Sequence, residues 1–229
     1  MRMPHGQRPP ERREQIVLAA AAVLGRDGYA ATTLKQIARE ADVAPGLLHY
    51  YFRSKDDLLI AVIEALFQRF IDEWQESVEG LTDPFDRISA AIDRFASICA
   101  ERPEVTRLLL DFYALSVGTP ALRDRTRRLL SELQEHVAEE IRLNTASLPT
   151  PPPAEEKDFV MAIHGALDGV SALGLVAGED MSGAFRVLKM FFLSFAAMSF
   201  VAAGQPVPLE KIMSLIQPAG AEVRPDVNR

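Results

Sequence analysis

The stretch from Thr33 to Phe52 reads TLKQIAREADVAPGLLHYYF and predicts two short helices joined by a tight turn. Asp42 falls at the turn position that needs a left-handed backbone, which aspartate tolerates better than most residues. Pro45 can begin the second helix because the first N–H of a helix has no intrahelical partner. This spacing is typical of a helix-turn-helix, whose second helix can enter the DNA major groove. Apolar side chains recur where two crossed helices would bury them, at Ile37, Ala41, Val43, Leu48 and Tyr51.

Helical spacing of apolar residues continues outside this stretch, and no alternating pattern of a β-strand stands out. The longest break between helical segments, Ser147 to Pro153, contains four prolines, which cannot continue a helix. We therefore predict an all-α protein of about nine helices. Three long helices are expected over Lys55–Glu79, about Ala154–Ala177 and Ser182–Ala203.

Composition limits the classes of function that the chain can have. The 229 residues are 48% hydrophobic and 25% charged, as in an ordinary folded protein. A single cysteine, Cys99, excludes a disulfide framework and a Cys-rich zinc site. The net charge of −7 excludes a protein that coats DNA over its whole surface, yet residues 1–55 carry +4 and the remainder −11. This asymmetry predicts that the N-terminal end meets a polyanion.

The single cysteine fits a reducing, cytoplasmic compartment, and the apolar segments predict neither a signal peptide nor a membrane partner. The stretch from Ile16 to Leu24 has no signal-peptide cleavage site and is closed by Arg26-Asp27-Gly28. The most apolar segment, Met190–Ala203, is shorter than the roughly 18–20 residues that span a bilayer. It is therefore expected to be a buried helix in a core or in an oligomer interface.

The run Asp27–Leu59 resembles the DNA-binding domain of the tetracycline-repressor-like (TetR) transcriptional regulators. The resemblance implies a three-helix helix-turn-helix domain over residues 1–55 and a helical ligand-binding and dimerisation domain over 56–229. The sequence departs from the family pattern at Asp42, Ala44 and His49, where glycine, a Ser/Thr helix cap and tyrosine are usual. The motif itself is carried by Gly28-Tyr29, Thr32-Thr33, Ile37-Ala38, Gly46, Leu48, Tyr51-Phe52, Ser54-Lys55 and Leu58.

The resemblance also implies which residues contact double-stranded operator DNA. The hydroxyls of Thr32 and Thr33 are expected to hold a phosphate, and Lys55 to pair with another. His49 and Tyr50 are the expected hydrogen-bonding readers or phosphate contacts, with plain surface as an equal alternative for His49. Tyr51 and Phe52 are expected in the core. The start of the second helix would face base edges with Ala44, Pro45, Gly46 and Leu47.

The inner faces of the later helices form either ordinary core or an apolar pocket for an unknown small effector. His164 and Asp168 are four residues apart, so they share a helix face and can pair or contact a ligand. No third ligand accompanies them, so we expect no metal and no cofactor. Cys99 fits an inert buried thiol better than a sensor. The candidate effector residues are Phe70, Trp74, Phe95, Cys99, Arg107, Asp111, Phe112, Tyr113, His164 and Asp168.

The last two long helices are apolar nearly all round, which indicates that they are buried on several sides. We expect them to pair with their copies in a symmetric homodimer, forming a four-helix interface. The candidate interface residues are Ile163, Leu167, Val170, Phe185, Leu188, Phe192 and Phe195.

The sequence thus favours a ligand-responsive DNA-binding repressor that leaves its operator when a small, largely apolar effector binds. An all-helical enzyme is disfavoured, because G-x-S-x-G, H-E-x-x-H and P-loop motifs are absent. A helical scaffold whose DNA-binding motif is lost is the third possibility, since the second helix of the motif lacks a polar cap.

Overall fold

The computed structural model describes residues 9–150 and 155–217, which form ten α-helices and contain no β-strand. The all-α prediction is confirmed, with one helix more than expected. The predicted long helices are also present, with ends within two residues of those expected. In chain order the helices are α1 Pro9–Ala31, α2 Leu34–Glu40, α3 Pro45–Tyr51, α4 Lys55–Val78, α5 Pro84–Glu101, α6 Pro103–Gly118, α7 Pro120–Ala146, α8 Glu156–Ala177, α9 Ser182–Ala202 and α10 Leu209–Ile216.

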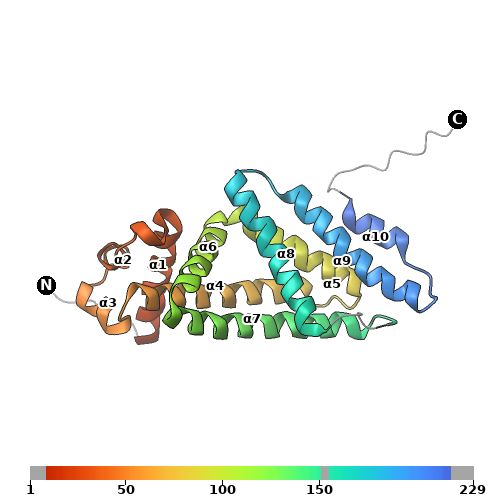
Figure 1. Ribbon diagram of the computed structural model, residues 1–229. Helices are drawn as coiled ribbons and strands as arrows, with labels where there is room; N and C mark the ends of the chain where they lie inside the picture. The colour runs from red at the N-terminus through yellow and green to blue at the C-terminus, as the bar shows by residue number, and fades with distance from the viewer. Residues whose placement is uncertain (1–8, 151–154, 218–229) are drawn as a thin grey trace.

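The helices form an elongated molecule with a small head at one end (Figure 1). The head consists of α1, α2 and α3. The long helices α4 and α7 lie side by side along the body, and α6 crosses them next to α1. The helices α8, α9 and α10 cover the other side of the body, where α9 packs on α5.

Local sequence explains where α4 begins and how it connects the head to the body. The Ser54 side chain caps the helix by accepting a hydrogen bond from the backbone N of Asp57 at 3.0 Å. Asp56 and Asp57 then place negative charge in the first turn, which favours the positive end of the helix dipole. The helix begins at the head and runs along the body to Val78 (Figure 1).

One hydrophobic core runs from the head into the body. Ile16, Ile37 and Leu48 of the head belong to the same buried cluster as Leu108 and Phe112 of α6. A second cluster joins Phe85 of α5 to α9 and α10. The head is therefore packed on α6 through apolar contacts and is not merely tethered to the body.

By length and composition alone, α8 and α9 could each cross a membrane, contrary to the expectation drawn from the shorter segment. Only 17% and 28% of their most apolar windows are buried. However, α9 is tied into the body by Lys189, whose buried ammonium contacts both carboxylate oxygens of Asp93 on α5 at 2.8 and 2.9 Å.

Candidate DNA-reading head and ligand cavity

The turn between α2 and α3 has the geometry that its residues predict. Thr33 caps α2 with a capping box: its hydroxyl oxygen accepts from the Gln36 N–H, and the Gln36 side chain accepts from the Thr33 N–H. Asp42 has a φ of 50°, which confirms the left-handed turn position. Pro45 begins α3 after Ala44, which makes no side-chain capping bond.

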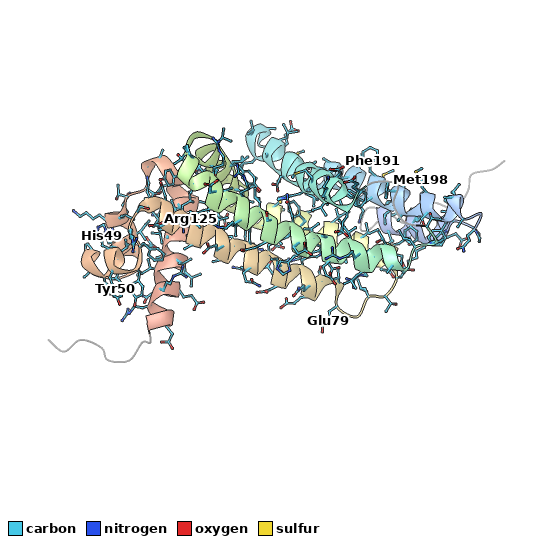
Figure 2. The ribbon with its side chains drawn as sticks, turned by 60° about the horizontal axis from the view of Figure 1, so that its bottom comes forward. His49, Tyr50, Glu79, Arg125, Phe191 and Met198 are labelled. Atoms are coloured by element: carbon cyan, nitrogen blue, oxygen red, sulfur yellow. The ribbon has the colours of Figure 1, made fainter. Side chains whose placement is uncertain are left out.

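The helix α3 is anchored by one side and exposed on the other. Leu48 is fully buried, whereas Ala44, Pro45, Gly46, His49 and Tyr50 are exposed and Leu47 is half-buried. The Tyr50 side chain is 80% exposed, and it lies with His49 at the outer end of the head (Figure 2). Tyr51 is half-buried and Phe52 is buried, so the prediction that they serve the core is confirmed.

The structure gives Thr32 a role different from the predicted phosphate contact. Its side chain is buried, and its hydroxyl donates to the carbonyl oxygen of Gly28 at 2.7 Å. The phosphate prediction is therefore wrong for Thr32, because a buried hydroxyl with an internal partner does not face DNA. The neighbouring Thr33 is exposed, so of the two threonines only Thr33 can reach a DNA phosphate.

Lys55 also makes its main contacts within the head. Its ammonium donates to the carbonyl oxygens of Tyr29 at 2.7 Å and Thr32 at 2.9 Å, and it lies 4.0 Å from the centre of the Tyr29 ring. The Tyr29 hydroxyl donates to Asp56, and burial together with this carboxylate raises the Tyr29 pKa. Lys55 thus joins the end of α1 to the start of α4, and a phosphate contact by its third N–H stays a prediction.

The missing cap of α3 leads to a stability prediction. Ala44→Ser supplies a hydroxyl that can accept a bond from an unpaired N–H in the first turn of α3. We expect the free energy of unfolding to rise by about 1 kcal/mol in urea denaturation. Ala44→Val, which adds bulk without a polar group, is the matched control, and an equal gain from both variants would contradict the capping explanation.

A cavity of about 180 Å³ lies inside the body, between α4, α5, α6, α7, α8 and α9. Its lining is mainly apolar. Aromatic rings pack against one another in it: Phe70 lies 5.9 Å from Trp74 and 5.7 Å from Phe95, measured between ring centres. Of the ten candidate effector residues, the lining contains Phe70, Trp74, Phe95, Cys99, His164 and Asp168.

A polar group forms part of this cavity. The Tyr113 hydroxyl donates to Asp168 at 2.9 Å, and His164 Nε2 lies 3.2 Å from the same carboxylate. Tyr113 does not itself line the cavity, but its hydrogen bond holds the lining residue Asp168 in place. Burial together with the Asp168 carboxylate raises the pKa of Tyr113. Burial also raises the pKa of the Cys99 thiol, which keeps it protonated. The predicted proximity of His164 and Asp168 is therefore present, with a third member that holds the carboxylate.

Arg107, Asp111 and Phe112 do not line the cavity, so their assignment to it is wrong. Asp111 accepts a hydrogen bond from the backbone N of Tyr29 at 2.9 Å, and Arg107 donates to the carbonyl of Arg26 at 3.3 Å. Phe112 is fully buried in the shared core. Arg107 and Asp111 face the head because they lie on the other side of α6 from the cavity-lining Val105, Thr106 and Leu109, whereas Phe112 is enclosed by the core that α6 shares with the head.

Gly28 allows the close contact between α1 and α6. Its backbone has φ 76° and ψ 164°, a region that is essentially restricted to glycine. A Cβ atom at this position would lie 2.6 Å from Nη2 of Arg107. The glycine of the head motif is thus required by its backbone conformation, whereas the guanidinium is the end of a flexible side chain that can move aside.

The sequence reasoning missed two charged residues of the cavity, Arg102 and Glu140. Arg102 contacts Glu73 together with Arg69 and Arg94, whereas Glu140 pairs with Arg87. Burial alone would raise the pKa of Glu73, but hydrogen bonds from the three arginines lower it to about 2. Both charges therefore have counter-charges, which no sequence spacing signals because the partners lie on different helices.

The outward face of α8 and α9 is apolar, but it is not made of the predicted interface residues. Ile163, Leu167, Phe192 and Phe195 line the cavity, and Phe185 is buried. Only Val170 and Leu188 remain, and both are half-buried. Figure 2 shows Phe191 and Met198 on the same outer side of α9. The large apolar residues exposed on these helices are Met161, Leu173, Val176, Val187, Met190, Phe191, Met198 and Val201.

Two family descriptions match separate parts of the chain, one mainly over the head and one over the body. Residues 16–62 match the family described as bacterial regulatory proteins, tetR family. Residues 84–189 match the family described as BetI-type transcriptional repressor, C-terminal. The first match begins within α1 and ends in the first part of α4, and the second begins at α5 and ends within α9.

Curated relatives are regulators with a helix-turn-helix. The regulator HbdR of Aromatoleum sp. is 37% identical over 98 residues, which is 43% of each chain. The regulator BetI of Rhizobium meliloti is 38% identical over 134 residues, 56% of this chain and 61% of the relative. BetI of Brucella canis is 32% identical over 135 residues, 57% of this chain and 68% of the relative. The matches to the first two thus span less than two thirds of their length.

Solved structures share the fold at low identity. A putative regulator from Saccharomonospora viridis in complex with choline has a TM-score of 0.66 at 18% identity, covering 81% of this chain and 96% of that one. FadR from Bacillus subtilis in complex with stearoyl-CoA has a TM-score of 0.63 at 18% identity, covering 89% and 96%.

Proposed function

Because this chain belongs to the TetR family of transcriptional regulators, we propose that it is a homodimeric repressor that leaves its operator when a small ligand fills the cavity. The proposal assigns residues 1–55 to DNA reading and residues 56–229 to ligand binding and dimerisation. The observation that carries it is the double use of α6. One side of this helix lines the cavity, and the other side holds the head through Arg107 and Asp111.

Because α6 contacts both the cavity and the head, its movement can couple ligand binding to DNA binding. A ligand that displaces Thr106 or Leu109 also displaces Arg107 and Asp111, because a helix moves as one body. The contact with Tyr29 at the end of α1 then changes the position of the head. The ligand can shift the protein only by its difference in affinity between the two head positions.

The exposed side of α3 supports a role in reading bases. Tyr50 and His49 project from the head without burial, whereas Leu48 anchors the helix from behind. We expect Tyr50→Ala to cost about 1–3 kcal/mol in binding to the DNA upstream of the protein's own gene, and less on unrelated DNA. Gel shifts at two salt concentrations measure this. Glu79→Ala, at the far end of α4, is the control (Figure 2). If the protein retains no DNA even at low salt, the result would favour a helical scaffold whose DNA-binding motif is lost.

The apolar outer face of α8 and α9 supports dimerisation. Exposed Phe191 and Met198, 67% and 65% accessible, form part of a larger apolar face of the kind that marks an interface. A second copy related by a two-fold axis would bury this face in a four-helix contact and place two heads against DNA half-sites. The same face would then be unavailable to lipid, so we propose a cytoplasmic protein whose purification needs no detergent.

The cavity supports binding of a small, largely apolar ligand. Solved structures of the same fold hold choline and stearoyl-CoA, which differ greatly in size and polarity. The cavity of this chain combines aromatic walls with a few polar groups, an arrangement suited to specific binding. We assign no enzymatic role to His164 and Asp168, because regulators of this family are not catalysts.

A further inference from the structure

One hydrogen-bond donor at the cavity stands out. Trp74 lines the cavity, and its Nε1 is buried without a hydrogen-bond partner among the described residues. An indole N–H can only donate, so it needs an oxygen or another acceptor that no described residue supplies. Buried donors without partners are rare and lower stability, so a ligand atom that accepts this hydrogen bond would bind favourably.

The charged side chains of the lining are already paired within the protein. Arg102 contacts Glu73, and Glu140 contacts Arg87. Asp168 accepts from Tyr113 and lies beside His164. An anionic ligand group would find a counter-charge only by breaking the Arg102 pair, and burying it in a cavity that also holds the Asp168 carboxylate is costly. A quaternary ammonium group has no lone pair with which to accept the hydrogen bond of Trp74 Nε1. An uncharged ligand meets no such penalty.

We propose that the ligand is an uncharged, mainly apolar molecule whose single oxygen acceptor, a carbonyl or ether, takes the hydrogen bond of Trp74 Nε1. Its apolar body packs on Phe70, whose ring lies beside that of Trp74, and on Phe95, whose ring packs against Phe70. This inference rests on the proposed function only in taking the cavity as the ligand site.

Two probes of nearly equal shape test the acceptor. Acetophenone carries a carbonyl where ethylbenzene has a methylene group, and calorimetry on the full chain measures the affinity of each. We expect acetophenone to bind about five- to tenfold more tightly than ethylbenzene, the difference that one neutral hydrogen bond makes. Benzoate, the charged analogue, is expected to bind more weakly than acetophenone.

Trp74→Phe removes the donor and keeps an aromatic ring. This variant is expected to bind the two neutral probes with equal affinity, and to unfold at the same urea concentration as the parent or a higher one, since it loses an unpaired polar atom. Phe70→Leu is the matched control. It should lower the affinity for both neutral probes and preserve the ratio of the two affinities. Three outcomes would overturn the inference. The first is that Trp74→Phe keeps the parent's ratio of acetophenone affinity to ethylbenzene affinity. The others are that benzoate binds more tightly than acetophenone, or that neither neutral probe binds at millimolar concentration.

The outcome is separable from the proposed function. Retention of upstream DNA by the ligand-free chain is measured without any probe. A chain that retains DNA but shows no preference for the ketone keeps its proposed function and loses this ligand class. A chain that prefers the ketone but retains no DNA keeps the ligand class and loses the function.

Discussion

Replacement of Phe191 and Met198 together by aspartate is expected to convert the proposed dimer into a monomer and to weaken operator binding by about 10²–10⁴-fold. Each copy would bring two carboxylates into the apolar face of α8 and α9, where they have no counter-charge and lose their hydration. The monomer would retain one head. It would therefore lose the gain in affinity that comes from linking two heads on one DNA.

Light scattering and gel shifts measure the two parts of this prediction. Leu143→Asp, a change of the same kind at an exposed residue of α7, is the control and should leave mass and DNA binding unchanged. The double variant should stay folded, because both side chains are already exposed in the single chain. A parent protein that is monomeric at micromolar concentration, or soluble only in detergent, would refute the proposed interface.

Gly28→Ala is expected to lower the free energy of unfolding by about 2–4 kcal/mol. The main cause is the backbone, because an alanine is strained at φ 76° and ψ 164°. A smaller cost comes from the Arg107 guanidinium, whose Nη2 would lie 2.6 Å from the new Cβ and must shift. Urea denaturation followed by circular dichroism measures the loss. Because the same contact positions the head, retention of operator DNA should fall as well.

Two further variants separate the causes. Gly46→Ala, in α3 with no atom within 4 Å of the added Cβ, should leave stability unchanged or raise it by up to about 1 kcal/mol. Combining Gly28→Ala with Arg107→Ala should restore only the part of the loss due to the close approach, because the backbone strain persists. A Gly28→Ala protein as stable as its parent would show that the chain does not need this backbone conformation inside α1.

The head was predictable because its determinants are local. Asp42 and Pro45 set the turn by their own backbone preferences, and Ser54 caps α4 through a hydrogen bond three residues away. Each of these effects operates within a few residues, so the order of residue types carries the information. The long helices were predictable for the same reason, since proline and glycine breaks interrupt the apolar spacing.

The faces of the later helices were not predictable, because they depend on distant partners. In α8 and α9 nearly every side has apolar residues, so no polar stripe distinguishes Phe192, which lines the cavity, from Phe191, which is exposed. Likewise, Arg107 and Asp111 differ from cavity residues only in facing α1, an element about 80 positions earlier in the chain. Thr32 shows the same effect at short range, because burial by surrounding helices removed a hydroxyl that its motif suggested was free.

The unpaired Trp74 makes the protein its own optical sensor. It is the single tryptophan of the chain, so all indole fluorescence comes from the wall of the cavity. Ligand entry can therefore be followed in stopped-flow mixing without a label, and the rate of cavity filling can be compared with the rate at which DNA is released. A delay between the two would time the movement of the head directly.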